Sequence, residues 1–150
     1  MDQNEFLDAL DVLLKTESDP IACMANAAAL LFHSLEGVNW VGFYLLKDDE
    51  LVLGPFQGKV ACTRIALNRG VCGAAFSGNC VLRVDNVHAF VGHIACDEDS
   101  CSEIVLPLRN NQGMPFGVLD IDSPQFSRFS ETDEHLLLQA ANRIASAILS

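Results

Sequence analysis

Hydrophobic side chains recur with a helical period near both ends of the chain. From residue 4 to residue 15 they follow the three- and four-residue spacing of an amphipathic helix. Asp19-Pro20 combines a favourable N-cap with a proline at the first helical position, which predicts a second helix that ends at Gly37. Ser130-Glu-Thr-Asp133 is typical of a capping box, and the helix that follows it is expected to run to the C-terminus.

Between these helices the pattern changes to the alternation that is typical of β-strands. In the segment 39–47, the single tryptophan and the single tyrosine of the chain, Trp40 and Tyr44, lie on one face with Gly42 between them. Ordinary packing explains this face, because strands favour aromatic residues. An aromatic wall with room for a ligand over Gly42 explains it equally well, and the pattern does not decide between the two.

The remaining segments complete an α+β plan. Glycine and proline mark 54–58 as a loop, and the motif Gly70-Val-Cys-Gly73 leads into a short helix. Further strands are expected at 51–53, 61–67, 81–84, 104–108 and 116–121. We therefore predict a single domain over residues 1–150, with a mostly antiparallel central sheet, helices packed on one face and a ligand pocket under loops on the other.

Composition and charge narrow the class of partner. The 150 residues carry a formal net charge of −11, which argues against nucleic acid and against anionic membrane surfaces as partners. The N-terminal residues lack a signal-peptide pattern, and no apolar run reaches the roughly 18 residues of a spanning helix. These features predict a cytoplasmic protein, whose six cysteines are packed, metal-binding or redox-active thiols and not a disulfide framework.

Reactive side chains are concentrated in residues 88–103, which hold two of the four histidines, two of the six cysteines and four acidic residues. Binding and catalytic groups commonly lie on such loops. Asp120 and Asp122 share one face of a predicted strand and repel each other unless a cation or a hydrogen-bond donor lies between them, the alternative being a solvated strand end. Cys72 falls near the N-terminus of the short helix, where aligned N–H groups can stabilise a thiolate.

Three kinds of chemistry fit these residues. The first is a metal site, whose ligands would be His88, His93, Cys96 and Cys101. The second is a regulatory ligand-binding domain in which the cysteines are incidental. The third is thiol chemistry, in which a thiolate attacks an oxidised sulfur, a carboxylic acid protonates the departing oxygen, and a second thiol condenses with the resulting sulfenic acid. Spacing alone does not choose among the cysteines.

Six motifs in chain order resemble those of the free methionine-(R)-sulfoxide reductases. They are Gly54-Pro-Phe-Gln-Gly-Lys59, Ala61-Cys62 with Arg64-Ile65, Gly70-Val-Cys-Gly73, Gly92-His-Ile-Ala-Cys-Asp97, Ser102-Glu-Ile-Val105 and Gly117-Val-Leu-Asp-Ile-Asp-Ser123. The resemblance covers nearly the whole chain. It implies a GAF fold and reduction of the free amino acid methionine-(R)-sulfoxide to methionine, with no bound cofactor.

The resemblance also implies roles for three cysteines. Cys96 matches the family's nucleophile, which becomes a sulfenic acid, and Cys62 matches the resolving cysteine that closes a disulfide. Thioredoxin is then the expected external reductant. Cys72 matches a third motif cysteine with an auxiliary role.

For substrate binding, Glu103, Asp120 and Asp122 match carboxylates that hold the ammonium and bond the sulfoxide oxygen. Trp40 and Tyr44 match an aromatic wall around the methyl end. The chain departs from the family pattern at Val91, where many members have proline, and at Cys101, where a non-thiol residue is usual. A non-catalytic GAF-type sensor of a small ligand or of redox state is the alternative function, and a homodimer is an assembly that the sequence leaves open.

Overall fold

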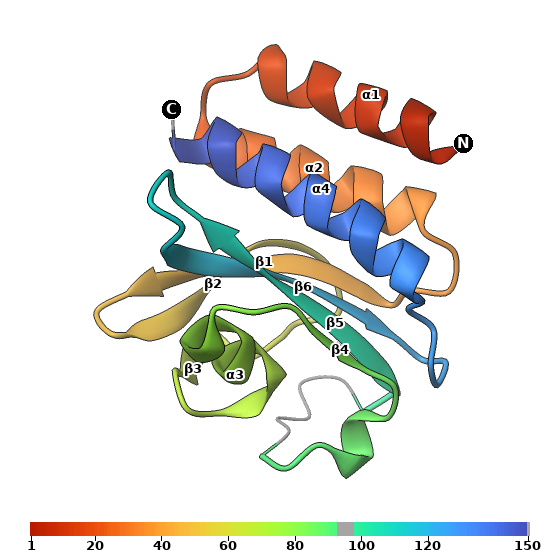
Figure 1. The fold of residues 1–150 in the computed structure, drawn as a ribbon, viewed down its shortest axis with the longest axis vertical. Helices are drawn as coiled ribbons and strands as arrows, with labels where there is room; N and C mark the ends of the chain where they lie inside the picture. The colour runs from red at the N-terminus through yellow and green to blue at the C-terminus, as the bar shows by residue number, and fades with distance from the viewer. Residues whose placement is uncertain (93–97, 150) are drawn as a thin grey trace.

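Three amphipathic helices form one layer of the domain, as the sequence predicts. The computed structural model describes residues 1–92 and 98–149, and in it the layer consists of α1 (Gln3–Lys15), α2 (Pro20–Ser34) and α4 (Glu131–Leu149). α2 and α4 lie directly on the sheet, and α1 packs across both of them (Figure 1). None of the helices in the described ranges has the length and apolarity needed to cross a membrane.

The predicted helix starts are confirmed by their hydrogen bonds. The Asp19 carboxylate accepts a hydrogen bond of 3.0 Å from the backbone N–H of Ala22. At the start of α4, the Ser130 hydroxyl accepts from the Asp133 N–H at 3.1 Å, and the Asp133 carboxylate accepts from the Ser130 N–H at 2.9 Å. These side chains satisfy N–H groups that have no partner inside the helix.

The central sheet has six strands in the order β3-β2-β1-β6-β5-β4, and every neighbouring pair is antiparallel. The strands are β1 (Trp40–Lys47), β2 (Glu50–Gly58), β3 (Arg64–Ala66), β4 (Leu82–Val84), β5 (Ser102–Arg109) and β6 (Pro115–Ser123). A helix α3 (Gly70–Gly78) and a 3-10 turn η1 (Val87–Ala89) lie on the face opposite the helical layer (Figure 1). The predicted α+β class, with helices on one face, is confirmed.

The segment 54–58 is strand and not loop, which corrects the sequence prediction. Along the β1–β2 ladder, Gly42 pairs with Phe56 but Tyr44 pairs with Leu53, so Gly54 and Pro55 form a bulge. A proline is tolerated at a bulge because the ladder does not need its missing N–H there. The third strand is also shorter than predicted, so that Cys62 precedes it in an irregular segment.

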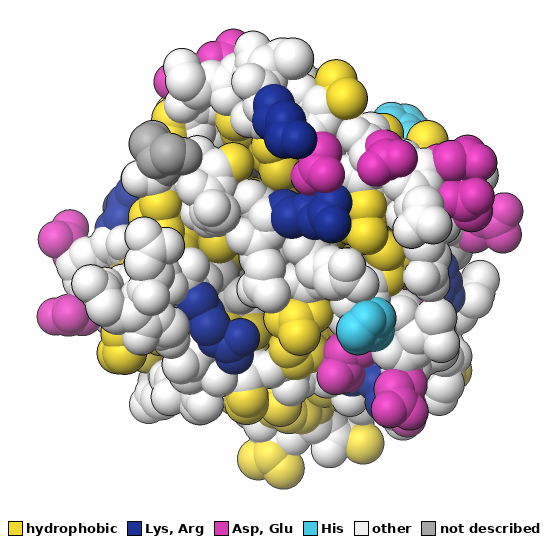
Figure 2. Space-filling model, turned by 45° about the horizontal axis from the view of Figure 1, so that its top comes forward, with side chains coloured by type: hydrophobic (Ala, Val, Ile, Leu, Met, Phe, Trp, Pro, Cys, Tyr) yellow, Lys and Arg dark blue, Asp and Glu magenta, His cyan; other side chains and the backbone are white. Residues whose placement is uncertain are grey.

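Charged and apolar side chains are mixed on the outer surface of the helical layer. Figure 2 brings this layer forward and shows Lys and Arg side chains separated from one another by acidic, polar and hydrophobic ones. On this face the described side chains form no continuous basic patch.

Candidate active site

Sheet register brings three carboxyl groups together on the face away from the helical layer. Glu103 on β5 lies directly opposite Asp122 on β6. Asp120 is two residues before Asp122 on the same strand, so its side chain points to the same face. Asp120 in turn lies opposite Gly42 of β1. The predicted pairing of Asp120 with Asp122 is confirmed, and Glu103 joins it from the neighbouring strand.

Two of these carboxyl groups are almost completely buried. Glu103 is 7% exposed and Asp120 is 5% exposed. Burial raises the pKa of Glu103 well above its usual value, and the charge of Asp120 raises it further. Burial and the charge of Asp122 raise the pKa of Asp120, while hydrogen bonds with Glu103 and Cys72 oppose part of that rise. These carboxyl groups therefore keep a proton at a pH at which an exposed acid has lost it.

One atom of this group lacks a donor. The Oδ1 atom of Asp120 is buried and has no hydrogen-bond partner within the described ranges. A buried carboxylate oxygen without a donor costs roughly 1–3 kcal/mol or more. The cluster of Glu103, Asp120 and Asp122 is thus prepared to receive a group that carries several N–H donors and a positive charge.

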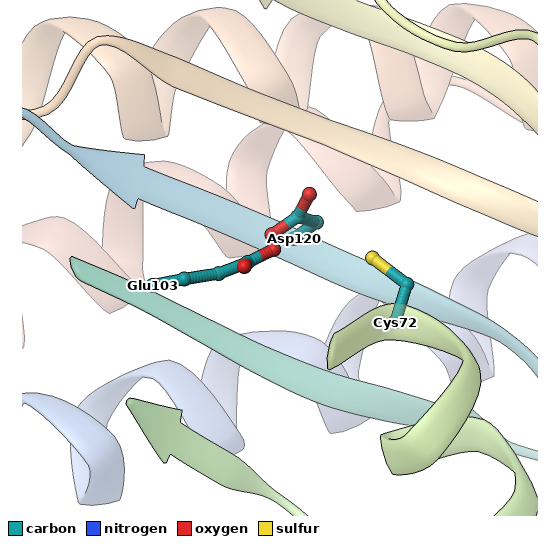
Figure 3. Close-up of side chains that lie close together, drawn as sticks. All are labelled: Cys72, Glu103 and Asp120. Atoms are coloured by element: carbon teal, nitrogen blue, oxygen red, sulfur yellow. The ribbon is translucent and has the colours of Figure 1, made fainter. Parts of the chain in front are cut away.

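Helix α3 adds the Cys72 thiol to this cluster. Figure 3 shows Cys72 in the first turn of α3 with its sulfur directed at Asp120, and Glu103 reaching Asp120 from β5. The Cys72 Sγ atom and one carboxylate oxygen each of Glu103 and Asp120 all lie within 4.8 Å of one another. This is the group of side chains within the described ranges whose spacing would suit a metal ion, although an ammonium group suits the same three residues.

The prediction that Cys72 is present as a thiolate is wrong. The side chain is 5% exposed, and its burial raises the thiol pKa well above the usual value. The charges of Asp120, Glu103 and Asp122 raise it further. Burial and the nearby carboxyl groups outweigh the stabilisation of a thiolate by the N-terminus of this nine-residue helix, because desolvation is the largest cause of the raised pKa.

A cavity opens over the carboxyl groups between the sheet and α3. The centre of a water molecule can reach about 40 Å³ of it, roughly three times the 10–15 Å³ that one water needs. Its polar lining consists of Ser100, Glu103, Asp120, Asp122 and Arg69. Its apolar lining comes from Trp40, Tyr44, Val60, Ala61, Ile65 and the start of α3. The predicted pocket on the face opposite the helices is therefore present.

The two aromatic residues form a wall of this cavity, but the space over Gly42 is filled. Trp40 stacks on Tyr44 with ring centroids 6.0 Å apart and on Phe56 at 5.4 Å. A Cβ atom built on Gly42 would lie 2.5 Å from both the Trp40 ring and Phe56. The glycine therefore allows the indole to lie close to the sheet, and the expected room for a ligand lies beside the aromatic rings and not over Gly42.

The structure separates the cysteines into different environments. Cys62 is disulfide-bonded, whereas Cys23, Cys72, Cys80 and Cys101 are free thiols. The Tyr44 hydroxyl donates a hydrogen bond of 2.9 Å to the backbone oxygen of Cys62, which fixes that segment at the edge of the cavity. The predicted nucleophile Cys96 lies outside the described residues.

The metal site expected from residues 88–103 remains a prediction. His88 is exposed and Cys101 is half-buried. The other two expected ligands, His93 and Cys96, lie outside the described residues. His88 stacks edge-on against Phe126 with ring centroids 6.2 Å apart.

Sequence reasoning missed two side chains at this site. Arg69 is the one Lys or Arg among the described residues that line the cavity, and it directly precedes α3. It forms no salt bridge with the described acidic residues. The second side chain is Phe56, which the sequence pattern places in a loop. In the structure Phe56 lies opposite Gly42 in the β1–β2 ladder and packs over that glycine. A glycine inside a strand is the signal that could have indicated such an aromatic neighbour.

The fold recurs in known proteins. A model of the GAF domain matches residues 19–148. Protein YtsP of Bacillus subtilis is 53% identical to this chain, covering 98% of it and 91% of that protein. The free methionine-R-sulfoxide reductase of Escherichia coli is 49% identical, covering 99% of this chain and 92% of that protein. The structure of free methionine-R-sulfoxide reductase from Neisseria meningitidis in complex with its substrate superposes with a TM-score of 0.93 at 43% identity, covering 98% and 88% of the two chains.

Proposed function

The chain belongs to the GAF domain family and, within it, to the free methionine-R-sulfoxide reductases, and we propose that it reduces free L-methionine-(R)-sulfoxide to L-methionine by thiol chemistry. The observation that carries this proposal is the group of buried Glu103, buried Asp120 and half-buried Asp122 at the cavity, with the Oδ1 atom of Asp120 unpartnered within the described ranges. A free amino acid brings an ammonium group to such a site.

The same group accounts for selection of the free amino acid. The substrate's ammonium donates to the carboxylates, and its methyl end lies against Trp40 and Tyr44. A peptide-bound sulfoxide has no ammonium, so it would leave buried carboxylates without a donor. Sites built to pair a polar group reject analogues that lack it by large factors. Peptide sulfoxides are therefore expected to be poor substrates.

The reductive step needs a nucleophile and a proton donor. In the proposed step the Cys96 thiolate attacks the sulfoxide sulfur, the S–O bond breaks, and oxygen ends on Cys96 as a sulfenic acid while methionine leaves. Glu103 supplies the proton that makes the oxygen a leaving group, while the Asp120 carboxylate pairs with the ammonium. Burial supports this role, because it raises the pKa of Glu103 well above its usual value and so keeps the carboxylic acid at a pH at which an exposed glutamate is charged.

Recycling uses a second thiol. The Cys62 thiol attacks the sulfenic acid of Cys96, which releases water and forms a disulfide, and thioredoxin reduces that disulfide by exchange. The disulfide-bonded state of Cys62 and its place at the cavity edge support the assignment of Cys62 as the resolving residue. The cycle needs no resident cofactor, and it fits a cytoplasmic enzyme because thioredoxin acts in reducing compartments. The sequence leaves a homodimer open, and sedimentation equilibrium of the purified protein measures the oligomeric state.

The first experiment compares methionine formation by the wild-type protein and by single cysteine variants. With free methionine-(R)-sulfoxide and a thioredoxin system, we expect multiple turnovers for wild type, at most one methionine per chain for Cys62→Ser, and none for Cys96→Ser. Cys80→Ser is the control, because Cys80 is exposed and lies outside the cavity lining. Turnover by Cys96→Ser would place the nucleophile elsewhere. No turnover by wild type, together with a tightly bound small ligand in the purified protein, would favour a sensor.

A further inference from the structure

The proposed cycle uses two cysteines, yet a third thiol lies beside the buried carboxyl groups. Cys72 Sγ is within 4.8 Å of carboxylate oxygens of both Glu103 and Asp120. It comes from α3, whereas the acids come from β5 and β6, so the contact depends on how α3 packs over the sheet (Figure 3). A thiol at this place contacts the groups that bind the substrate.

Cys72 is poorly suited to be a nucleophile. Its side chain is buried, and three carboxyl groups lie near it, so loss of the thiol proton would add a negative charge to an anionic site. A thiolate is the form that attacks sulfur, and the environment of Cys72 disfavours that form. The thiol therefore stays neutral and keeps its proton.

A neutral thiol beside Asp120 can act as a hydrogen-bond donor. Asp120 has room for a further donor, because its Oδ1 atom has no partner within the described ranges, and the protonated Glu103 carboxyl group can donate one hydrogen bond only. Tyr44 lies on the adjacent strand β1, but its hydroxyl donates to the backbone oxygen of Cys62. Cys72 is thus a second neutral side chain, besides protonated Glu103, that lies beside Asp120 with an available proton.

We propose that Cys72 is a positioning residue whose neutral thiol donates a hydrogen bond to Asp120 and holds that carboxylate toward the ammonium of the substrate. The proposal rests on the proposed function for the identity of the ligand, but the hydrogen bond itself is a property of the free protein. It makes Cys72 a part of substrate recognition that never changes its oxidation state.

Serine and nonpolar substitutions then differ in a definite way. Cys72→Ser retains a donor of similar size, whereas Cys72→Ala removes it. Cys72→Val also removes the donor, and it fills the volume so that water does not enter. The titratable groups near Asp120 in every variant are Glu103 from β5, Asp122 from β6 and Tyr44 from β1, and the cation Arg69 lines the same cavity.

The sign of the effect on Asp120 follows from the hydrogen bond. The interaction with Cys72 lowers the pKa of Asp120 against the opposing effect of burial. Removing the donor therefore raises the pKa of Asp120, and the charged carboxylate that binds an ammonium forms only at higher pH. The acidic limb of substrate binding is expected to move to higher pH in Cys72→Ala and Cys72→Val, and to stay in place in Cys72→Ser.

The decisive measurement is the titration of the Asp120 carboxyl carbon by 13C NMR in the substrate-free protein, a chain of 16.3 kDa. We expect an upward shift of its midpoint in Cys72→Ala and Cys72→Val, and a midpoint at or below that of wild type in Cys72→Ser. Cys23→Ala is the matched control, since Cys23 is a buried free thiol in the helical layer and its removal should leave Asp120 unchanged. An unchanged midpoint in both donor-free variants would overturn the proposal.

Binding and turnover give an independent readout. In the Cys96→Ser background, calorimetry should show a dissociation constant for methionine sulfoxide about five- to tenfold weaker in the donor-free variants, and within about twofold for Cys72→Ser. Disulfide formation by Cys62 in the otherwise wild-type chain should keep its stoichiometry in all three variants. Loss of that disulfide in Cys72→Ser would assign Cys72 a redox role and overturn the proposal. Absence of turnover by wild type would refute the proposed function alone, because the NMR titration needs no substrate.

Discussion

Both faces of the central strands are buried, but one face buries apolar side chains and the other buries acidic and aromatic ones. On the face toward the helical layer, Phe43, Leu106 and Leu119 are completely buried and belong to one apolar core. On the opposite face, their neighbours in the chain include Tyr44 and Asp120, which are 2% and 5% exposed. Burial on the first face stabilises the fold, whereas burial of acids on the second face costs free energy. The face that buries acids at a cost in free energy is therefore the face on which a functional site is expected, and this inference needs no comparison with relatives.

This contrast explains how the fold tolerates buried acids on the cavity face. Three strands are held together by the apolar core behind them, so the front face can carry groups that would be unstable elsewhere. Low exposure makes each interaction of Asp120 and Glu103 stronger and keeps a proton on the pair. The helical layer therefore supplies the stability, and the cavity face uses part of it.

The largest difference between the two faces is expected for Asp120→Asn, which should lower activity without lowering stability. This change keeps the shape of the side chain but removes its charge. We expect kcat/KM for free methionine-(R)-sulfoxide to fall by about 30- to 1000-fold, since pairing a buried charge with an ammonium is worth roughly 2–4 kcal/mol. The free energy of unfolding, measured with urea, should stay unchanged or rise, because repulsion between Asp120 and Asp122 is relieved.

The adjacent residue on the other face provides the control for this prediction. Leu119→Ala should lower the free energy of unfolding by about 2–5 kcal/mol. Its activity per folded molecule should remain near that of wild type, because Leu119 points away from the cavity. If Asp120→Asn lost as much stability as Leu119→Ala, the cavity face would be structural and the comparison would fail.

A second prediction concerns pH. Glu103 and Asp120 have folded-state pKa values raised above their usual values of 4.5 and 3.8, so the folded protein binds protons more tightly than the unfolded chain. Their contribution to stability is fully present below those usual values and is lost as the pH rises through the raised ones. The loss is about 1.4 kcal/mol for each pKa unit of difference per group.

Urea unfolding from pH 3 to pH 8, at about one-unit steps, measures this dependence. The double variant Glu103→Gln/Asp120→Asn should lack the decline that wild type shows as pH rises. Ile104→Val, next to Glu103 but on the helical side, should keep the wild-type decline at a slightly lower stability. Parallel pH profiles for wild type and the double variant would show that the two carboxyl groups have the same pKa values in the folded and unfolded states, which would contradict the prediction.

Alternation along the strands could be predicted from the sequence because it is a local property. Trp40 and Tyr44 were placed on one face, and Asp120 and Asp122 on one face, from a period of two residues alone, and both assignments are confirmed. The extent of β2 could not be predicted. Gly54 and Pro55 are usual loop residues, and only the ladder with β1 makes them a bulge inside a strand.

The state of Cys72 shows the corresponding limit for chemistry. Its predicted position at the start of a helix is confirmed, but the thiolate that this position can stabilise is not favoured, because burial raises the pKa of the Cys72 thiol. The acids that decide its protonation, Glu103 and Asp120, come from distant strands, and a sequence does not show how closely α3 brings the thiol to them. Environment, more than local helix position, sets the pKa of a buried group.

The smallest effect is expected for Tyr44→Phe, which tests whether the cavity face also positions the resolving cysteine. The Tyr44 hydroxyl donates to the Cys62 backbone oxygen at 2.9 Å, and burial and the charge of Asp120 keep that hydroxyl protonated by raising its pKa. Phenylalanine retains the stacking on Trp40 and removes the donor, so stability should fall by about 1 kcal/mol. The rate of disulfide formation after one turnover, measured by counting thiols in quenched-flow samples, should fall by about two- to fivefold because the Cys62 segment is less firmly held.

The rate of methionine release in the same turnover should not change, since that step precedes the use of Cys62. A slower release of methionine would instead assign Tyr44 to the reductive step, and the two halves of the cycle would then share one residue on the cavity face.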